Sequence, residues 1–194
     1  DFVRDVVREF WKRYGEERRE GLLPKMAIYC SQIRELEDEF RPLLEQVLAS
    51  EGIPTGKILV NHSEAEEDSV RQFRELDLPE SEKQFILLVG RGTEGWNCRS
   101  LFSCVMYRRP HSRVFVLQSS MRCLRAIGDM PQTAMVCVST ENRRLLEAEI
   151  EKNLGTTLGA IESAQNRTRI TVQRLRDKRV RLAREVRRVK QVEV

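Results

Sequence analysis

Short apolar runs alternate with longer segments of helical periodicity along this chain, and the alternation constrains the fold more than any other feature. Each run is short enough to be one buried strand, and most are followed by apolar residues spaced three and four apart, as in an amphipathic helix. Strands that alternate with helices favour a mostly parallel α/β sheet with helices on both faces. The strands that we expect are 25–30, 57–60, 85–89, 101–107 and 134–138.

The segments between these runs predict the helices. A helix beginning at Ser31, as its N-cap, would run to about Gly52, and Pro42 can introduce a kink in it. In the helix that opens at Ser112 and is closed by Gly128, the residues expected to face inward are Val116, Met121, Leu124 and Ile127. The other expected helices are 2–14, 64–76 and 143–154.

Charge is distributed unevenly. The segment 167–194 holds 11 of the 34 Lys and Arg residues against 3 acidic residues, a net charge of +8. The preceding residues hold 23 basic and 27 acidic groups, a net charge of −4. This asymmetry fits a tail that binds a polyanion, and it fits equally a solvated charged helix or a linker to another domain. The pattern of Val and Arg in the tail suits either a basic helix or edge hairpins.

Composition excludes several classes of protein. No apolar run approaches the roughly 20 residues that cross a bilayer, so we expect no membrane span. No secretory leader is visible. The cysteine pattern favours reduced thiols and a cytoplasmic protein. The chain has five Cys without a C-x-x-C pair and only two His, so we expect reduced cysteines and neither a zinc site nor a disulfide scaffold.

The chain has no acceptable phosphate-binding loop of its own. The nearest match, at residues 52–58, has three residues between its glycines instead of four. Ile58 also stands where the Mg²⁺-binding Ser or Thr belongs. No Asp-Glu pair lies on an expected strand, so we expect no ATPase activity from this chain alone.

Three segments are informative when they are read together. The first, 25–32, is a buried strand that ends in small polar residues. The second, 86–97, is a strand leading into a glycine-rich polar loop, and another strand follows it. The third, 118–125, carries Arg122 and Arg125, which we expect on one face of a helix. Two arginines at this spacing are a weak signal alone, but the order of all three segments is much more specific.

In this order the chain resembles the second RecA-like domain (P-loop NTPase-type fold) of superfamily-two helicases and DNA translocases. Residues 25–32 stand at that family's fourth motif, 92–97 resemble its fifth and 118–125 its sixth. The wording Thr-Glu-Gly-Trp-Asn at 93–97, with Arg-Cys-Leu-Arg at 122–125, is most similar to the Res subunit of type III restriction enzymes. The resemblance covers roughly residues 25–140.

The resemblance implies a set of residues at a nucleotide cleft between two RecA-like domains. Hydrolysis of ATP needs cations around the charge that develops on the γ-phosphoryl group. Arg125 would be the arginine finger, Arg122 would contact phosphate or hold the acids of the cleft, and Gln118 would sense the γ-phosphate or position water. ATP and Mg²⁺ would be bound mainly by the missing first domain. The residues implied to face the cleft from the fifth motif are Glu94, Gly95 and Asn97.

The resemblance also implies contacts to the DNA backbone, which position a motor without reading sequence. Ser31 and Gln32 would touch the sugar-phosphate track, and His62 could do the same, although a lone His is more often structural. Trp96 is better suited to burial than to stacking on a base. From the fifth motif, the implied phosphate contacts are Arg91, Gly92 and Thr93.

The organisation that follows is a connector helix at 1–24, a RecA-like domain at 25–140 and a helical, basic C-terminal extension at 141–194. The implied partners are DNA, the first RecA-like domain of a longer chain and a methyltransferase or specificity subunit. The extension would lead to a following domain, a nuclease if the restriction resemblance holds.

The chain departs from the family's pattern at three positions. Met121 and Cys123 stand where the sixth motif usually has Gly, and Asn97 stands where the fifth usually has Asp. These departures leave two alternatives open. One is a non-catalytic nucleic-acid-binding module that keeps the fold and binds through its basic tail. The other is a protein-interaction module whose tail binds an acidic partner.

Overall fold

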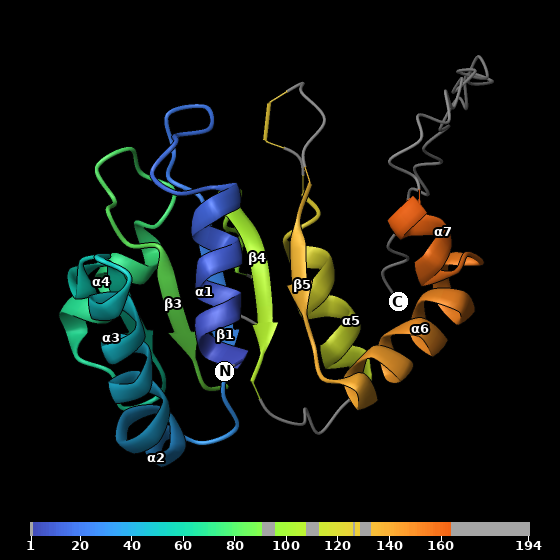
Figure 1. Cartoon of the computed structure of the whole chain (residues 1–194), viewed down its shortest axis with the longest axis horizontal. Helices are drawn as coiled ribbons and strands as arrows, with labels where there is room; N and C mark the ends of the chain where they lie inside the picture. Colours follow the sequence, from blue (N-terminus) through green and yellow to red (C-terminus); the bar gives the residue numbers. More distant parts are fainter. Residues whose placement is uncertain (1, 91–95, 108–112, 126, 129–132, 164–194) are drawn as a thin grey trace, which may run out of the picture.

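The computed structural model describes residues 2–90, 96–107, 113–125, 127–128 and 133–163. Its centre is a five-stranded sheet in the order β2-β3-β1-β4-β5, with every neighbouring pair parallel. Helices cover both faces of this sheet, and Figure 1 shows α1 in front of it and α5 behind. The predicted parallel α/β architecture is therefore confirmed.

The strands lie where the apolar runs placed them, within two residues at each end. The order differs from that of the sequence at the centre of the sheet, because β1 pairs with β3 on one side and with β4 on the other, whereas β2 pairs with β3 and β5 with β4. The bounds are β1 Lys25–Tyr29, β2 Ile58–Asn61, β3 Phe85–Leu88, β4 Leu101–Met106 and β5 Met135–Cys137.

The helices fill the connections between the strands. Ser139 caps α6 by accepting a hydrogen bond of 3.2 Å from the amide of Asn142, and Gly155 ends it in the left-handed conformation. The bounds are α1 Phe2–Arg13, α2 Ile33–Glu35, the π-helical η1 Leu36–Phe40, α3 Arg41–Ser50, the 3₁₀ turn η2 Thr55–Lys57, α4 Glu67–Arg74, α5 Arg113–Arg122, α6 Thr140–Leu154 and α7 Leu158–Ser163.

The first face of the sheet is covered by α1 and α3. Alternate strand residues such as Met26 and Phe85 point toward these helices and are fully buried. Phe10 of α1 is also fully buried, and its ring lies 5.6 Å from the ring of Phe85. Helix α1, which we expected as a connector, thus forms part of the core of the sheet domain.

The second face is covered by α5 and α6, with the end of α4 beside them. Strand residues of the opposite parity, such as Ala27 and Ile86, pack here with Val116 of α5 and Leu146 of α6. Ile150, one turn beyond Leu146, joins the same cluster. Helix α6, placed in the expected extension, therefore packs on the same sheet.

Two predictions about helix ends are wrong. The helix after β1 has Gln32 rather than Ser31 at its N-cap, and no side chain caps it. Helix α5 ends at Arg122 and not at Gly128, so Arg125 lies beyond the helix and the two arginines do not share a helix face. Leu124, expected inside, is 49% exposed for the same reason: the helical phase is lost before that residue.

Candidate nucleotide-cleft and nucleic-acid residues

Ser31, Gln32 and His62 lie at one edge of the sheet. Ser31 and Gln32 follow the carboxyl end of β1, and His62 follows that of β2, with β3 between the two strands. Since carboxyl ends of parallel strands meet at one edge, this is where open α/β sheets bind ligands. Ser31 and Gln32 are exposed there. Arg91, Gly92 and Thr93, predicted as phosphate contacts, lie outside the described residues.

His62 is buried, and both of its ring nitrogens are engaged. Nδ1 accepts a hydrogen bond of 3.2 Å from the amide of Glu64, so the ring proton is on Nε2, which lies 3.1 Å from Oε1 of Glu37. Arg41 donates to the other carboxylate oxygen of Glu37 at 3.0 Å. Burial acts to raise the pKa of Glu37, but the hydrogen bonds from His62 and Arg41 outweigh it and lower that pKa. His62 therefore fixes η1 against the end of β2.

The two arginines of segment 118–125 both contact the segment that leads from β3 to β4. Nη1 of Arg125 donates a hydrogen bond of 2.6 Å to Oδ1 of Asn97. Nη1 of Arg122 donates to the main-chain oxygen of Trp96. These bonds join residues 28 and 26 positions apart in sequence. We call Arg122, Arg125, Trp96 and Asn97 the arginine cluster.

Gln118, another predicted cleft residue, lies on α5 one turn before Arg122, on the same side of the helix, and is exposed. Glu94 and Gly95 lie outside the described residues. Arg125 and Asn97 are themselves exposed, so a guanidinium is presented at the surface beside the fifth-motif segment. This arrangement suits an anion such as a phosphoryl group.

The aromatic ring of Trp96 packs inside the domain. It stacks on Phe73 of α4, with ring centroids 5.0 Å apart and an interplanar angle of 24°. Both rings lie against the apolar cluster of the second face. One face of the indole is therefore occupied by Phe73.

Asp77 holds the segment before β4, and the sequence analysis missed it. Its carboxylate accepts hydrogen bonds from the amides of Arg99 at 2.6 Å and Ser100 at 3.0 Å, and from Oγ of Ser100 at 2.6 Å. Burial acts to raise the pKa of Asp77, but the bonds from Ser100 and Arg99 outweigh it and lower that pKa. The sequence offers no specific signal for this role, because an acid between a helix and a strand is common.

None of the five cysteines forms a disulfide in the part of the chain that the structure describes. Burial raises the pKa of Cys98 and of Cys123 to about 12, and that of Cys137 to about 11. Burial also raises the pKa of Cys104 well above its usual value. These thiols stay protonated near neutral pH, and a protonated thiol is a poor nucleophile.

In the part of the chain that the structure describes, no three His, Cys, Asp or Glu side chains gather into a possible metal site. None of the helices described is both long and apolar enough to span a bilayer.

Two solved helicase domains align with this chain. Domain 2 of the DEAD-box helicase Mss116p, bound to an RNA duplex, aligns with a TM-score of 0.53 and 11% identity over 80% of this chain and 54% of that one. The C-terminal domain of S. cerevisiae Dbp5, bound to Gle1 and IP6, aligns with a TM-score of 0.49 and 15% identity over 79% of this chain and 78% of that one.

The first of these likenesses shows that the chain has the fold of a RecA-like helicase domain. The chain spans about half the length of the Mss116p chain that it matches. No protein-family profile matches the sequence. No curated protein matches it either.

Proposed function

We propose that this chain is the second motor domain of an ATP-dependent DNA helicase or translocase. The observation that carries the proposal is the hydrogen bond between Arg125 and Asn97, because it joins the two segments that resemble the fifth and sixth helicase motifs. The RecA-like fold supports it independently.

Within this proposal Arg125 is the arginine finger. Its guanidinium is exposed and is oriented by Asn97, so it can approach an anion from outside without moving a buried group. A planar guanidinium stabilises the charge that spreads over phosphoryl oxygens in the transition state. Gln118 lies on the same side of α5 as Arg122 and would contact the γ-phosphate or the attacking water. Arg122 supports the segment 96–97 and would contribute positive charge behind Arg125.

ATP and Mg²⁺ would be held mainly by the first RecA-like domain, and the residues described here fit that division. They present cations at the arginine cluster and no acidic cluster that suits Mg²⁺. Glu94, Gly95 and Asn97 would line this half of the cleft. When bound, Mg²⁺ supplies charge neutralisation between the phosphates.

Ser31 and Gln32 would contact the nucleic-acid backbone at the carboxyl edge of the sheet, together with Arg91, Gly92 and Thr93. Mss116p domain 2 was solved on an RNA duplex, which supports a nucleic-acid ligand for this fold. The amino-acid sequences at 93–97 and 122–125 favour DNA as the ligand and a type III restriction-like motor, with a methyltransferase or specificity subunit as partner. His62 would act here by fixing η1 at this edge.

A non-catalytic nucleic-acid-binding module is the second candidate, and one observation favours it. Both arginines donate to the segment 96–97, as side chains with a purely structural role would do. In that case binding would depend on the basic segment 167–194. Removal of this segment would then abolish DNA binding, and the salt dependence of binding would be steep.

Replacement of Arg125 tests the motor directly. We expect Arg125→Ala, made in the natural protein that carries this chain, to lower DNA-stimulated ATP hydrolysis by about 10³-fold or more. The control is Arg13→Ala, which removes an exposed arginine of α1 that pairs with Glu9 in the preceding turn. Unchanged hydrolysis with Arg125→Ala would exclude the finger role. Absence of DNA-stimulated hydrolysis in the unmodified protein would favour the non-catalytic module.

A further inference from the structure

Strand β2 forms an open edge of the sheet, with β3 as its single neighbour in the part of the chain described. At the two ends of β2, main-chain carbonyls accept hydrogen bonds from the residues that flank β3. The carbonyl of Lys57 accepts from the amide of Gln84 at 2.9 Å, and that of Asn61 accepts from the amide of Val89 at 3.4 Å. Because main-chain groups alternate along a strand, the N–H and C=O groups of Ile58 and Val60 point away from β3.

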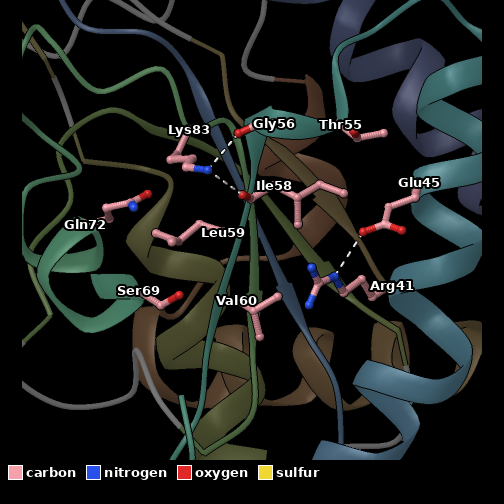
Figure 2. Close-up of a pocket in the computed structure, with 10 residues that line it drawn as sticks. All are labelled: Arg41, Glu45, Thr55, Gly56, Ile58, Leu59, Val60, Ser69, Gln72 and Lys83. Carbon is pink, nitrogen blue, oxygen red and sulfur yellow. Dashed lines mark hydrogen bonds and ion pairs between the residues drawn. The ribbon is translucent and has the colours of Figure 1, made fainter. Parts of the chain in front are cut away.

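A groove of about 320 Å³ follows this open edge. Its walls come from the two helices that flank β2: Arg41 and Glu45 of α3 on one side, and Ser69 and Gln72 of α4 on the other, as Figure 2 shows. We call it the β2 groove. Its floor is the main chain of β2 itself, so an occupant would lie against the strand.

Most of the main-chain groups at the floor are already paired, but those of Val60 are not. The amide of Ile58 donates to the carbonyl of Thr55. Nζ of Lys83 donates to the carbonyls of Ile58 at 3.0 Å and Gly56 at 2.7 Å (Figure 2). Among the residues described, no partner bonds to the N–H or C=O of Val60. One donor and one acceptor are therefore available in the middle of the groove.

One charge in the groove, that of Lys83, favours an acidic group beside it. Arg41 is neutralised by Glu37 and Glu45, each at 3.0 Å. Lys83 has no carboxylate within 4 Å in the described part of the chain, and two carbonyls use only two of its three N–H donors. Burial lowers the pKa of Lys83, and the charge of Asp68, which acts in the opposite direction, offsets this only in part. A carboxylate placed beside Lys83 would supply the missing counter-charge.

We propose that the β2 groove binds an extended, acidic peptide segment of a partner protein, which pairs with Val60 as an added strand and places a carboxylate against Lys83. Strand addition to an open edge uses main-chain hydrogen bonds for affinity and side-chain contacts for specificity. Open edges are usually blocked by lysines or covered by other elements. Lys83 caps one end of this edge and leaves Val60 accessible. The inference does not depend on the motor function.

The occupant would be short. The four residues of β2 span roughly 13 Å at the rise of an extended chain, so about four residues of a peptide can lie against the strand. The helices on both sides restrict the space to a single strand. Polar side chains at the walls, Ser69 and Gln72, suit a peptide whose outward residues are polar.

A labelled peptide, acetyl-Thr-Val-Glu-Val-Thr-amide, provides the probe, with binding followed by fluorescence anisotropy. Two further peptides serve as controls: one with Gln in place of Glu, and one with the amides of all five residues N-methylated, so that no residue's main-chain N–H can donate to a strand. We expect saturable binding below about 1 mM for the parent peptide, and at least about tenfold weaker binding for each control. Equal binding of the N-methylated peptide, or no saturable binding of the parent, would overturn the proposal.

Two variants of the chain locate the binding. Val60→Pro removes the outward N–H without touching the bonds to β3, as edge strands tolerate. Lys83→Gln keeps a donor for the carbonyls but removes the charge. We expect Val60→Pro to weaken the parent peptide about tenfold, and Lys83→Gln to abolish the preference for Glu over Gln. Lys12→Gln, which removes an exposed lysine of α1, is the control and should change neither.

Circular dichroism melting of each variant separates local effects from unfolding. If Val60→Pro unfolds the chain, Lys83→Gln still tests the proposal through the difference between the Glu and Gln peptides. Unchanged discrimination in a folded Lys83→Gln protein would contradict it. Sedimentation that shows self-association abolished by Lys83→Gln would assign the groove to a second copy of this chain instead, and would also overturn the proposal.

Discussion

The two faces of the sheet are built from different interactions. On the first face, α1 and α3 pack through aromatic and aliphatic side chains, with the ring of Phe10 against Phe85 and that of Tyr14 against Phe102. On the second face, apolar packing is combined with polar contacts that fix loops, such as those of Asp77 and Arg122. The residues with proposed functions lie near the second face and at the carboxyl edge of the sheet.

This difference indicates a division of roles. Apolar contacts supply free energy but little directional precision, since they scale with buried area. Hydrogen bonds contribute less net stability and specify where a loop lies. The first face should therefore determine whether the domain folds, whereas the second should determine where the segment 96–100 lies. The predictions below test this division.

The largest expected effect is on the first face. Phe10→Ala should lower the free energy of unfolding by about 3–5 kcal/mol, because it leaves a cavity where the ring is completely buried. Urea denaturation measures the change. Phe2→Ala, on the same helix but at a ring that is 45% exposed, is the matched control and should cost about 0.5 kcal/mol or less. Similar losses for both variants would contradict the role assigned to this face.

On the second face, Asp77→Asn should cost about 2 kcal/mol at pH 7, since charged acceptors make the stronger hydrogen bonds to Arg99 and Ser100. The pKa of Asp77 is lowered in the folded state. Its contribution is therefore complete above the unfolded pKa of about 3.9 and is lost as the pH falls through the lower folded value. The difference between the wild type and the variant should shrink below about pH 3.

Urea denaturation at several pH values measures this difference, with Glu80→Gln at an exposed carboxylate as the control. A difference that does not change with pH would show that the charge of Asp77 is unimportant. Amide hydrogen exchange at residues 98–100 supplies a second measure, because loosening should be local. Exchange that accelerates equally throughout the sheet would indicate loss of the core instead.

The strands could be predicted from sequence because each is buried on both faces and therefore reads as a continuous apolar run. All five lie within two residues of the predicted ends. The order of the strands could not be predicted in the same way, since nothing local in β2 or β3 specifies which of them pairs with β1. That choice depends on contacts between distant residues, such as Met26 with Phe85.

The polar contacts were predicted less well. Arg122, Arg125 and Asn97 were identified through the resemblance, and they lie close together in the structure. Periodicity did not locate the end of α5, which lies between the two arginines. Helix α5 contains Ser119 and Ser120 before its end, and serine is a weak helix former. Asp77 was missed because its function is defined by amides more than 20 residues away.

The stacked pair Phe73 and Trp96 should show a smaller effect. A double-mutant cycle with Phe73→Ala and Trp96→Ala should give a coupling energy of about 1 kcal/mol, the value typical of an aromatic pair. Thermal or urea unfolding of the four proteins measures it. A cycle between Phe73 and Phe10, which lie on opposite faces, is the control and should give no coupling. Additive losses for the stacked pair would show that α4 does not fix the segment 96–97.

The smallest expected effect is a gain in stability at Lys25, a fully buried cation at the start of β1 whose Nζ donates to the carbonyl of Leu23 at 3.0 Å. Burial lowers the pKa of Lys25. At a pH below this lowered pKa, the buried side chain is charged in the folded state and its charge destabilises the fold. Lys25→Met should therefore raise the free energy of unfolding by about 0.5 kcal/mol at pH 7. The wild type recovers stability as the pH rises through the lowered pKa toward 10.5, so the advantage of Met should decrease with pH. Calorimetry at pH 7 and about pH 9.5 measures both effects, with Lys12→Met at an exposed site as the control.

A loss of stability with Lys25→Met would mean that the cation itself, through the nearby Asp77, helps to hold the segment before β4, and would extend the polar network of the second face to the first strand.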